Sequence, residues 1–139
     1  MTARKEQGAS ERPKAARRHR RQWRDYRTAA GGRPIRDFFD TLTDEEAAEI
    51  LAAMKEVAEL GLATARHLRG DIYEVRAEGS TRTFRVVFAA EGKFSQVLLS
   101  LVAFVKKTQK TPHSELELAE DRLSQWRQRG YAKKKAPKT

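Results

Sequence analysis

The sequence predicts an α+β fold, in which two N-terminal helices pack on a twisted antiparallel sheet and a C-terminal helix follows. Three patterns support this prediction. Apolar residues recur at helical spacing in residues 34–60, at every second position in residues 71–89, and again at helical spacing after Pro112. Because each helix has a single apolar stripe, each needs a sheet face to cover, and we expect a two-layer domain.

A candidate strand and a short helix come first. Residues 22–28, QWRDYRT, fit a strand that the pair Gly31-Gly32 interrupts. Pro34 suits the first turn of a helix, and apolar residues recur after it at helical spacing. These residues are Ile35, Phe38, Phe39 and Leu42.

The second helix has a clear start and a clear end. TDEE, Thr43 to Glu46, is a capping box, in which the Thr43 hydroxyl accepts a backbone N–H of the first turn and Glu46 reaches back to the cap. Glycine suits the end of a helix, so we expect this helix to end at Gly61. The apolar stripe between these ends consists of Ala47, Ile50, Leu51, Met54, Val57 and Ala58.

Three antiparallel strands and a last helix follow. Residues 71–78 and 83–89 alternate between the two faces of a sheet, and residues 95–105 are apolar on both faces, as expected of a central strand. Thr111-Pro112 is a plausible cap for the last helix, and Gly130 is a suitable end. The apolar stripe of this helix consists of Leu116, Ala119, Leu123 and Trp126.

The net charge of +10 belongs to the two ends of the chain. The first 24 residues carry +7 and the last 13 carry +6, whereas the residues between them carry −3. We therefore divide the 139 residues into a basic flexible tail (1–21), one folded domain (22–130) and a second basic flexible tail (131–139). The sequence leaves open whether these tails bind phosphate or are only solvated.

The composition excludes several kinds of site. Because the chain has no cysteine, it has no disulfide framework and no cysteine metal site. His19, His67 and His113 do not have metal-ligand spacing, so we expect neither a metal nor another cofactor. No apolar segment approaches the roughly 20 residues that cross a bilayer, and no hydrophobic stretch follows the arginine-rich N-terminal segment as in a secretory signal. We therefore expect a cytoplasmic protein with no membrane partner.

Basic residues converge in the predicted fold. If the apolar positions of the two neighbouring strands pack under the helices, Arg76 and Arg85 both face away from them and share one open surface. Lys106, Lys107 and Lys110 arrive beside them where the central strand ends. Guanidinium groups match phosphate oxygens in bidentate geometry and lysines add point charge, so this surface is a candidate phosphate-binding site. The alternative is an ordinary solvated surface whose cations are neutralised by nearby glutamates.

Histidine and aromatic residues are weaker candidates. His113 lies in the first turn of the last helix, where a general acid or base could stand, although a histidine there is more often a plain surface residue. Tyr73 could stack on a base, as could Trp23 and Trp126. We expect both tryptophans to belong to the core instead.

Three segments resemble a known family. DIYEVRAEG and TFRVVF, and above all FVKKTQKTPHSELELAEDRL, resemble the phage-derived, HigB-like branch of the RelE/ParE toxin superfamily. The segment GGRPIRDFFDTLTDEEAAEI is similar to the front half of that family, and the resemblance covers about residues 22–128. The resemblance implies a RelE-like fold and a toxin of a type II toxin–antitoxin system. Such toxins are ribosome-dependent endoribonucleases that cut mRNA and thereby inhibit translation.

The resemblance also implies roles for individual residues. Arg85 would contact the scissile phosphate, and Arg76, Lys107 and Lys110 would complete a metal-free catalytic group in which the 2′-hydroxyl of the RNA attacks the adjacent phosphorus. The implied RNA-binding residues are Tyr73, Arg82, Lys106, Gln109 and His113. RelE has a C-terminal tyrosine that is important to its reaction, and some HigB proteins use a histidine or tyrosine near the end. Here Tyr131 lies beyond the expected helix end and His113 is a possible substitute, so the proton acceptor stays open.

The resemblance implies partners and leaves two alternatives. The partners would be the ribosome, mRNA and a cognate helix-turn-helix antitoxin, with operator DNA bound only through the antitoxin. One alternative is a ParE-type inhibitor of DNA gyrase, which has the same fold and cleaves no RNA. The other is a non-catalytic nucleic-acid-binding module whose basic tails bind RNA.

Overall fold

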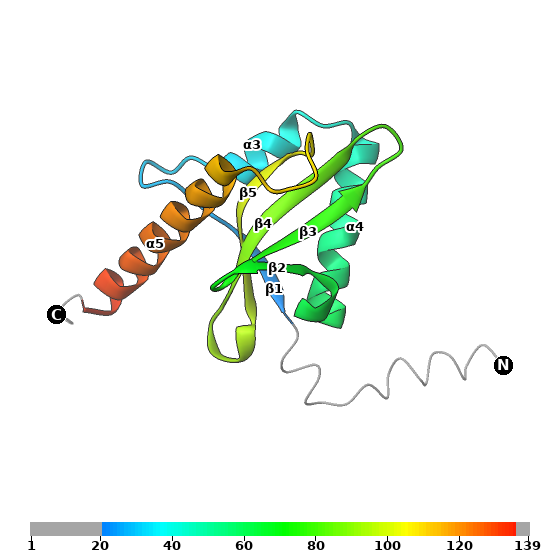
Figure 1. The fold of residues 1–139 in the computed structure, drawn as a ribbon. Helices are drawn as coiled ribbons and strands as arrows, with labels where there is room; N and C mark the ends of the chain where they lie inside the picture. The colour runs from blue at the N-terminus through cyan, green and yellow to red at the C-terminus, as the bar shows by residue number, and fades with distance from the viewer. Residues whose placement is uncertain (1–20, 136–139) are drawn as a thin grey trace, which may run out of the picture.

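The computed structural model describes residues 21–135 of the chain (Figure 1). Except for Arg21, the predicted tail 1–21 lies outside the described residues, and so do residues 136–139 of the second tail. The elements in chain order are β1 (Gln22–Asp25), α3 (Pro34–Asp40), α4 (Asp44–Leu60), the 3-10 turn η1 (Leu62–Thr64), β2 (Arg66–Arg69), β3 (Ile72–Glu78), β4 (Thr83–Glu91), the 3-10 turn η2 (Lys93–Ser95), β5 (Val97–Val105) and α5 (His113–Lys135).

The strands form one five-stranded sheet in the order β1-β5-β4-β3-β2. The pairs β3–β4 and β4–β5 are antiparallel, as predicted, and β2, a strand that the sequence analysis did not expect, is antiparallel to β3. β1 is the exception, because it pairs in parallel with β5, with Gln22 opposite Val97 and Asp25 opposite Ser100. The sheet is therefore mixed, and β1 is one of its two edge strands.

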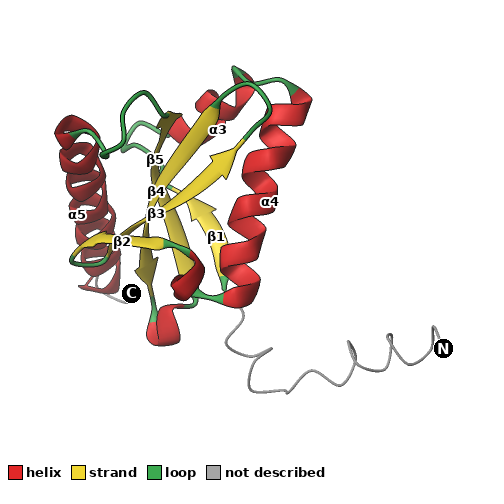
Figure 2. Ribbon diagram, turned by 45° about the vertical axis from the view of Figure 1, so that its right-hand side comes forward, coloured by secondary structure: helices red, strands yellow, loops and turns green. Residues whose placement is uncertain are grey.

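Helices cover both faces of the sheet, which corrects the expectation of two layers. Figure 2 shows α4 and α5 on opposite sides of the sheet. On the α4 face, Val75, Phe84 and Phe88 pack with Ile50, Met54, Val57 and Ala58 of α4, whereas Leu51 of the predicted stripe is exposed. On the other face, Leu99 and Leu101 pack with Ala119 and Leu123 of α5. The sequence pattern identified the stripe of α5 correctly but did not indicate which face it covers.

Most element boundaries agree with the sequence analysis. The capping box is present, since the Thr43 hydroxyl accepts from the backbone N–H of Glu46 and the Glu46 carboxylate accepts from the backbone N–H of Thr43, both at 3.1 Å. Gly61 follows α4 with φ of 101°, a conformation that glycine adopts without strain. Two expectations were wrong. β2 occupies residues 66–69, for which the sequence analysis expected no strand, and α5 continues through Gly130 to Lys135.

Neither tryptophan is fully buried. Trp23 packs beside the core of the α4 face, and its indole N–H donates to the carbonyl of Met54 at 2.7 Å. Trp126 packs at the margin of the core on the α5 face. None of the helices within residues 21–135 is both long enough and apolar enough to cross a membrane.

Candidate nucleic-acid interface

The α5 face of the sheet brings charged residues of three strands together. Arg76 of β3 is paired with Arg85 of β4, and Glu74 of β3 is paired with Arg66 of β2. Paired residues on neighbouring strands point to the same face, and so do residues two apart on one strand. All four side chains therefore lie on the face that α5 covers further along, and the prediction that Arg76 and Arg85 share a face is confirmed.

Arg85 does not lie on an open surface, which corrects the sequence-based expectation. Its side chain is fully buried, because the segment between β5 and α5 folds over it. Its Nη2 donates to the carbonyl oxygens of Thr108 at 3.0 Å and Gln109 at 2.5 Å, and its Nη1 lies 3.5 Å from the Thr111 hydroxyl. The guanidinium group thus holds residues 106–112, which we call the lysine segment, against the sheet.

Glu74 completes this buried group. Only 2% of Glu74 is exposed, its Oε1 lies 3.7 Å from Arg85 Nε, and its Oε2 accepts a hydrogen bond from the Thr111 hydroxyl. Burial lowers the pKa of Arg85, and the charge of Glu74 opposes this effect. Arginine stays protonated in proteins, so the two residues form a buried ion pair. The lysine segment therefore packs on a buried ion pair whose two charges offset each other.

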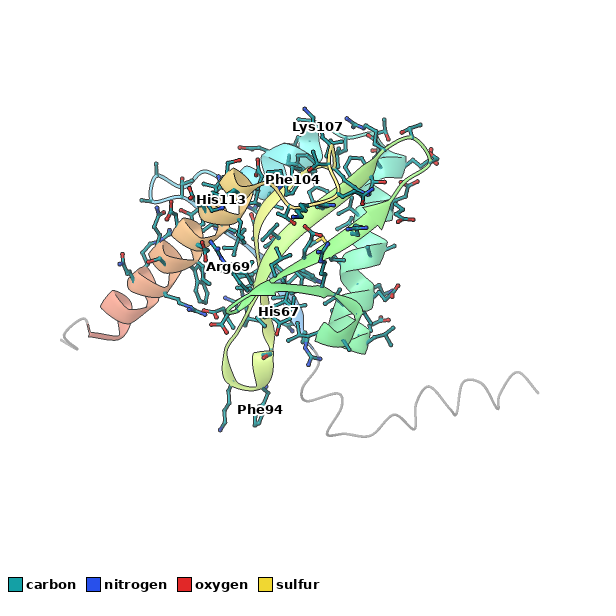
Figure 3. All side chains as sticks on the ribbon, viewed as in Figure 1. His67, Arg69, Phe94, Phe104, Lys107 and His113 are labelled. Carbon is teal, nitrogen blue, oxygen red and sulfur yellow. The ribbon has the colours of Figure 1, made fainter. Side chains whose placement is uncertain are left out.

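The lysine segment presents its cations to solvent. Its backbone is held by the bond from the N–H of Lys106 to the carbonyl of Thr83 (2.7 Å) and by the bond from the Thr108 hydroxyl to the carbonyl of Lys110 (2.7 Å). Lys107 and Lys110 are exposed, and Lys106 is half-buried. Figure 3 shows Lys107 on the outermost turn of this segment.

A shallow hollow of about 490 Å³ lies between the lysine segment and the β3–β4 turn. We call it the lysine hollow. Basic and polar side chains from both sides line it, which gives it a cationic character suited to an anionic ligand. Its lining residues are Thr81, Arg82, Thr83, Val105, Lys106, Lys107, Thr108 and Gln109.

Arg82, a predicted RNA-binding residue, already has a partner. Its Nε and Nη2 donate to Glu46 of the capping box at 2.9 and 3.1 Å, and its guanidinium carbon lies 5.2 Å from the centre of the Phe84 ring. This hydrogen bond lowers the pKa of the Glu46 carboxyl. Arg82 therefore ties the β3–β4 turn to the start of α4, although its side chain remains 44% exposed at the rim of the lysine hollow.

The two remaining predicted RNA-binding residues differ in position, because Tyr73 lies away from this cluster and His113 directly follows the lysine segment. Tyr73 is on the α4 face, where its ring stacks on Phe88 with centroids 5.7 Å apart and contacts His67 at 5.0 Å. The structure therefore does not bring Tyr73 to the face of Arg76. His113 begins α5 just after the lysine segment, is exposed, and pairs with Glu117 at 2.6 Å (Figure 3).

Sequence reasoning missed Arg66. It is exposed at the start of β2, and its side chain has no hydrogen bond or ion pair within the part of the chain that the structure describes. It lies close enough to Arg85 to lower the pKa of that residue. Arg76 is also exposed, and its side chain likewise has no hydrogen bond or ion pair within the described residues. The sequence offers little signal for β2, because RHLR has a single apolar residue, Leu68, and lacks the alternation of a strand.

The charged side chains of this face also indicate which kind of ligand it can bind. Within the described residues, no group of three or more histidine, cysteine, aspartate or glutamate side chains is placed to hold a metal ion. The donors gathered here are guanidinium and ammonium groups, which bind anions directly.

Comparisons with known proteins identify the family. The family described as "Phage derived protein Gp49-like" matches residues 37–124. The chain belongs to this family. The match includes α4, β2 to β5 and the first half of α5, so the Gp49-like domain contains the lysine segment and both members of the buried ion pair. The predicted relation to the HigB-like branch of the RelE/ParE superfamily is thereby confirmed.

Two curated relatives support the same assignment. Each has the name "Probable endoribonuclease HigB1", one from Mycobacterium tuberculosis strain CDC 1551 / Oshkosh and the other from strain ATCC 25618 / H37Rv. Each is 34% identical to this Gp49-like protein over 108 residues, which are 76% of this chain and 84% of the relative.

Proposed function

We propose that this protein is the toxin of a type II toxin–antitoxin system and cuts mRNA on the ribosome in the cytoplasm. The name of its two curated relatives supports an endoribonuclease. The observation that carries the proposal is the group of exposed, unpaired cations around a rigid base. Arg66, Arg76, Lys107 and Lys110 surround the buried pair of Glu74 and Arg85 and lack ion-pair partners within the described residues.

The proposed reaction is an internal phosphoryl transfer within the RNA. The 2′-hydroxyl oxygen of one nucleotide attacks the adjacent phosphorus, the bond to the 5′-oxygen of the next nucleotide breaks, and a 2′,3′-cyclic phosphate is left. Negative charge builds on the phosphate oxygens in the transition state. Arg76, Lys107 and Lys110 stabilise this charge, as preorganised cations do when they are fixed before the reaction begins.

Lys106, Gln109 and Arg82 have a binding role in this proposal. They line the lysine hollow, where they contact the RNA backbone on one side of the cut. Arg66 extends the cationic surface on the other side, across β3 from the hollow. Tyr73 has no role in the proposal, because it lies on the opposite face of the sheet.

Arg85 acts as a positioning residue. Its donors are occupied by carbonyl groups of the lysine segment, so it fixes the backbone that presents Lys107 and Lys110 and does not itself touch the phosphate. A transition-state contact loses its effect when its position varies by about an ångström, which gives such a support a large influence on rate.

His113 is the candidate for proton transfer. It follows the lysine segment directly, and Glu117 orients its ring through Nε2. The 2′-hydroxyl must lose a proton and the leaving 5′-oxygen must gain one. An imidazole suits either step at neutral pH.

A toxin of this class has three proposed partners. They are the ribosome with its bound mRNA and a cognate helix-turn-helix antitoxin. The antitoxin, not this chain, binds operator DNA.

The test is expression of the protein without its antitoxin, followed by primer extension on cellular mRNA and by cleavage of a defined mRNA with purified ribosomes. We expect growth arrest and discrete cuts for the wild type. Lys107→Ala/Lys110→Ala should lower the cleavage rate by about 10²- to 10³-fold, the loss typical of one transition-state contact. Its melting temperature should not change, since both side chains are exposed.

Three results would contradict the proposal. Intact mRNA together with a DNA-damage response would indicate a gyrase inhibitor. RNA binding without cleavage would indicate a non-catalytic module. Cleavage at the wild-type rate by the double lysine variant would show that the catalytic site lies elsewhere, even if the protein is a nuclease.

A further inference from the structure

The free edge of β1 lies beside a hollow of about 720 Å³. β1 is the outermost strand, and its residues alternate between backbone groups that bond to β5 and groups that point away from it. The N–H groups of Gln22 and Tyr26 donate to Gln96 and Ser100 at 2.8 and 2.9 Å. By this alternation, the backbone groups of Trp23 point outward. An edge of this kind is a template for one more strand.

Two hollows flank this edge, one on each face of the sheet. The first, of about 720 Å³, lies toward the end of α5, and we call it the arginine hollow. The second, of about 280 Å³, lies toward α3 and α4, and we call it the apolar hollow. The arginine hollow is lined by Trp23, Arg24, Asp25, Arg27, Trp126, Arg129 and Gly130. The apolar hollow is lined by Trp23, Arg24, Asp25, Arg33, Ile35, Arg36, Phe39, Leu51, Met54 and Ser100.

The two hollows differ in chemistry. In the arginine hollow, Arg24 and Arg27 are exposed and have no ion pair within residues 21–135. The carboxylate of Asp25 is already bound by Arg33, with contacts of 2.9 Å to both oxygens, and this bond lowers the pKa of Asp25. The net charge of the arginine hollow is thus positive. The apolar hollow presents Leu51, which is 54% exposed, an unusually open position for a leucine beside a core.

We propose that an extended acidic segment of the antitoxin docks along β1 as a sixth strand. Side chains of an added strand alternate between the two faces. Its acidic residues face Arg24 and Arg27, and its apolar residues alternate with them and enter the apolar hollow beside Leu51. The inference rests on the proposed function for the identity of the partner, and it adds where and by what chemistry the partner binds.

Other occupants fit the edge less well. Residues 1–20 of this chain carry more basic than acidic residues, and a second copy would place β1 against β1, so both would bring arginine against arginine. RNA would match the arginine hollow but not the apolar one. An alternating acidic and apolar strand matches both.

The proposed edge is separate from the candidate RNA site. β1 pairs with residues 97–100 of β5, whereas the lysine segment follows the other end of that strand. A segment held at β1 therefore leaves the lysine hollow uncovered. The two surfaces can be altered independently.

The test compares two charge reversals of equal size. Arg24→Glu/Arg27→Glu alters the edge, and Lys107→Glu/Lys110→Glu alters the RNA site. Each variant is purified, its melting temperature is measured, and its affinity for the cognate antitoxin and its cleavage of ribosome-bound mRNA are determined. The edge variant should bind the antitoxin at least tenfold more weakly and cleave mRNA at the wild-type rate. The lysine variant should retain antitoxin affinity within about threefold and lose cleavage.

A second measurement reports on the apolar hollow. Because the chain has no cysteine, Leu51→Cys provides a single site for an environment-sensitive thiol dye. Antitoxin binding should shift its emission, whereas a dye on Leu118→Cys, which replaces an exposed leucine of α5, should not respond.

The outcomes separate the inference from the proposed function. Equal antitoxin affinity of the edge variant and the wild type would overturn the inference while wild-type cleavage upholds the function. Loss of RNA affinity in the edge variant, with antitoxin binding intact, would assign the edge to RNA and also overturn it. Failure of the wild type to bind the antitoxin would also overturn the docking inference. The cleavage assay would still test the nuclease activity independently.

Discussion

Arg66 begins β2 and Arg69 ends it, yet the two arginines have opposite surroundings. Arg69 donates through Nε and Nη2 to Glu120 of α5 at 2.9 and 2.5 Å. Near it, Arg127 of α5 binds Asp71 at 2.7 Å and Glu91 at 2.6 Å. Arg66 has no such partner among the described residues. At one end of the strand arginine attaches a helix to the sheet, and at the other end it remains available for a ligand.

This contrast shows why a count of basic residues says little about function. An arginine that reaches a carboxylate, as Arg69 does, holds two elements of the fold together. An arginine without such a partner, as Arg66 is among the described residues, can bind a ligand. In Figure 3, Arg69 lies between β2 and α5, whereas Lys107 lies at the upper rim of the molecule.

The largest effect on stability should come from replacing Arg85, the buried arginine of the same sheet face. Arg85→Met leaves Glu74 buried and uncompensated, and removal of one partner of a buried ion pair typically costs about 3–5 kcal/mol of unfolding free energy. Urea unfolding of the variant measures this cost. Cleavage should also fall, because the lysine segment loses its support.

A matched double variant makes this prediction specific. Glu74→Gln/Arg85→Met removes both charges and should be more stable than Arg85→Met alone. Equal stability of the single and double variants would show that Glu74 and Arg85 do not compensate each other.

The two arginines of β2 allow a direct comparison at intermediate magnitude. Arg69→Ala should lower the unfolding free energy by about 0.2–1 kcal/mol, as for an exposed ion pair, and leave mRNA cleavage unchanged. Arg66→Ala should leave stability within about 0.5 kcal/mol and weaken cleavage about tenfold at low substrate, a loss of about 1.4 kcal/mol. Thermal unfolding and cleavage at two salt concentrations measure both quantities. The contrast fails if the variants lower cleavage equally.

The smallest effect concerns pH. The pKa of Glu46 lies below its ordinary value of 4.5 in the folded protein because Arg82 donates to it. A carboxyl whose folded pKa is lowered contributes stability above its unfolded pKa, and this contribution is lost as the pH falls through the folded pKa. Unfolding free energies measured from neutral pH down into this acidic range should therefore fall for the wild type. Glu46→Gln should make the decline shallower, and Glu49→Gln on the same helix is the control.

Much of the fold could be predicted from local patterns. The capping box at Thr43 and the period of two around Arg85 are properties of neighbouring residues, and the structure confirms both. β2 escaped prediction because it is short and charged and has an irregular register between His67 and Arg69. Gly130 failed as a helix end because glycine in an exposed helix costs only about 1 kcal/mol.

The candidate site was predicted in outline and not in detail. Alternation placed Arg76 and Arg85 on one face, but it cannot say what covers that face. The burial of Arg85 depends on residues 108–111, which are distant in sequence and have no regular pattern. The partner of Arg82 likewise lies on another element, so only the assembled structure shows that this arginine is engaged.

The parallel pairing of β1 with β5 also affects when the molecule can assemble. Gln22 lies opposite Val97, so β1 leaves a translating ribosome about 70 residues before β5, the strand with which it pairs. The carbonyl groups that Arg85 requires emerge later still. A nascent chain therefore cannot complete its cationic surface until residues 97–111 have joined β3 and β4 outside the ribosome.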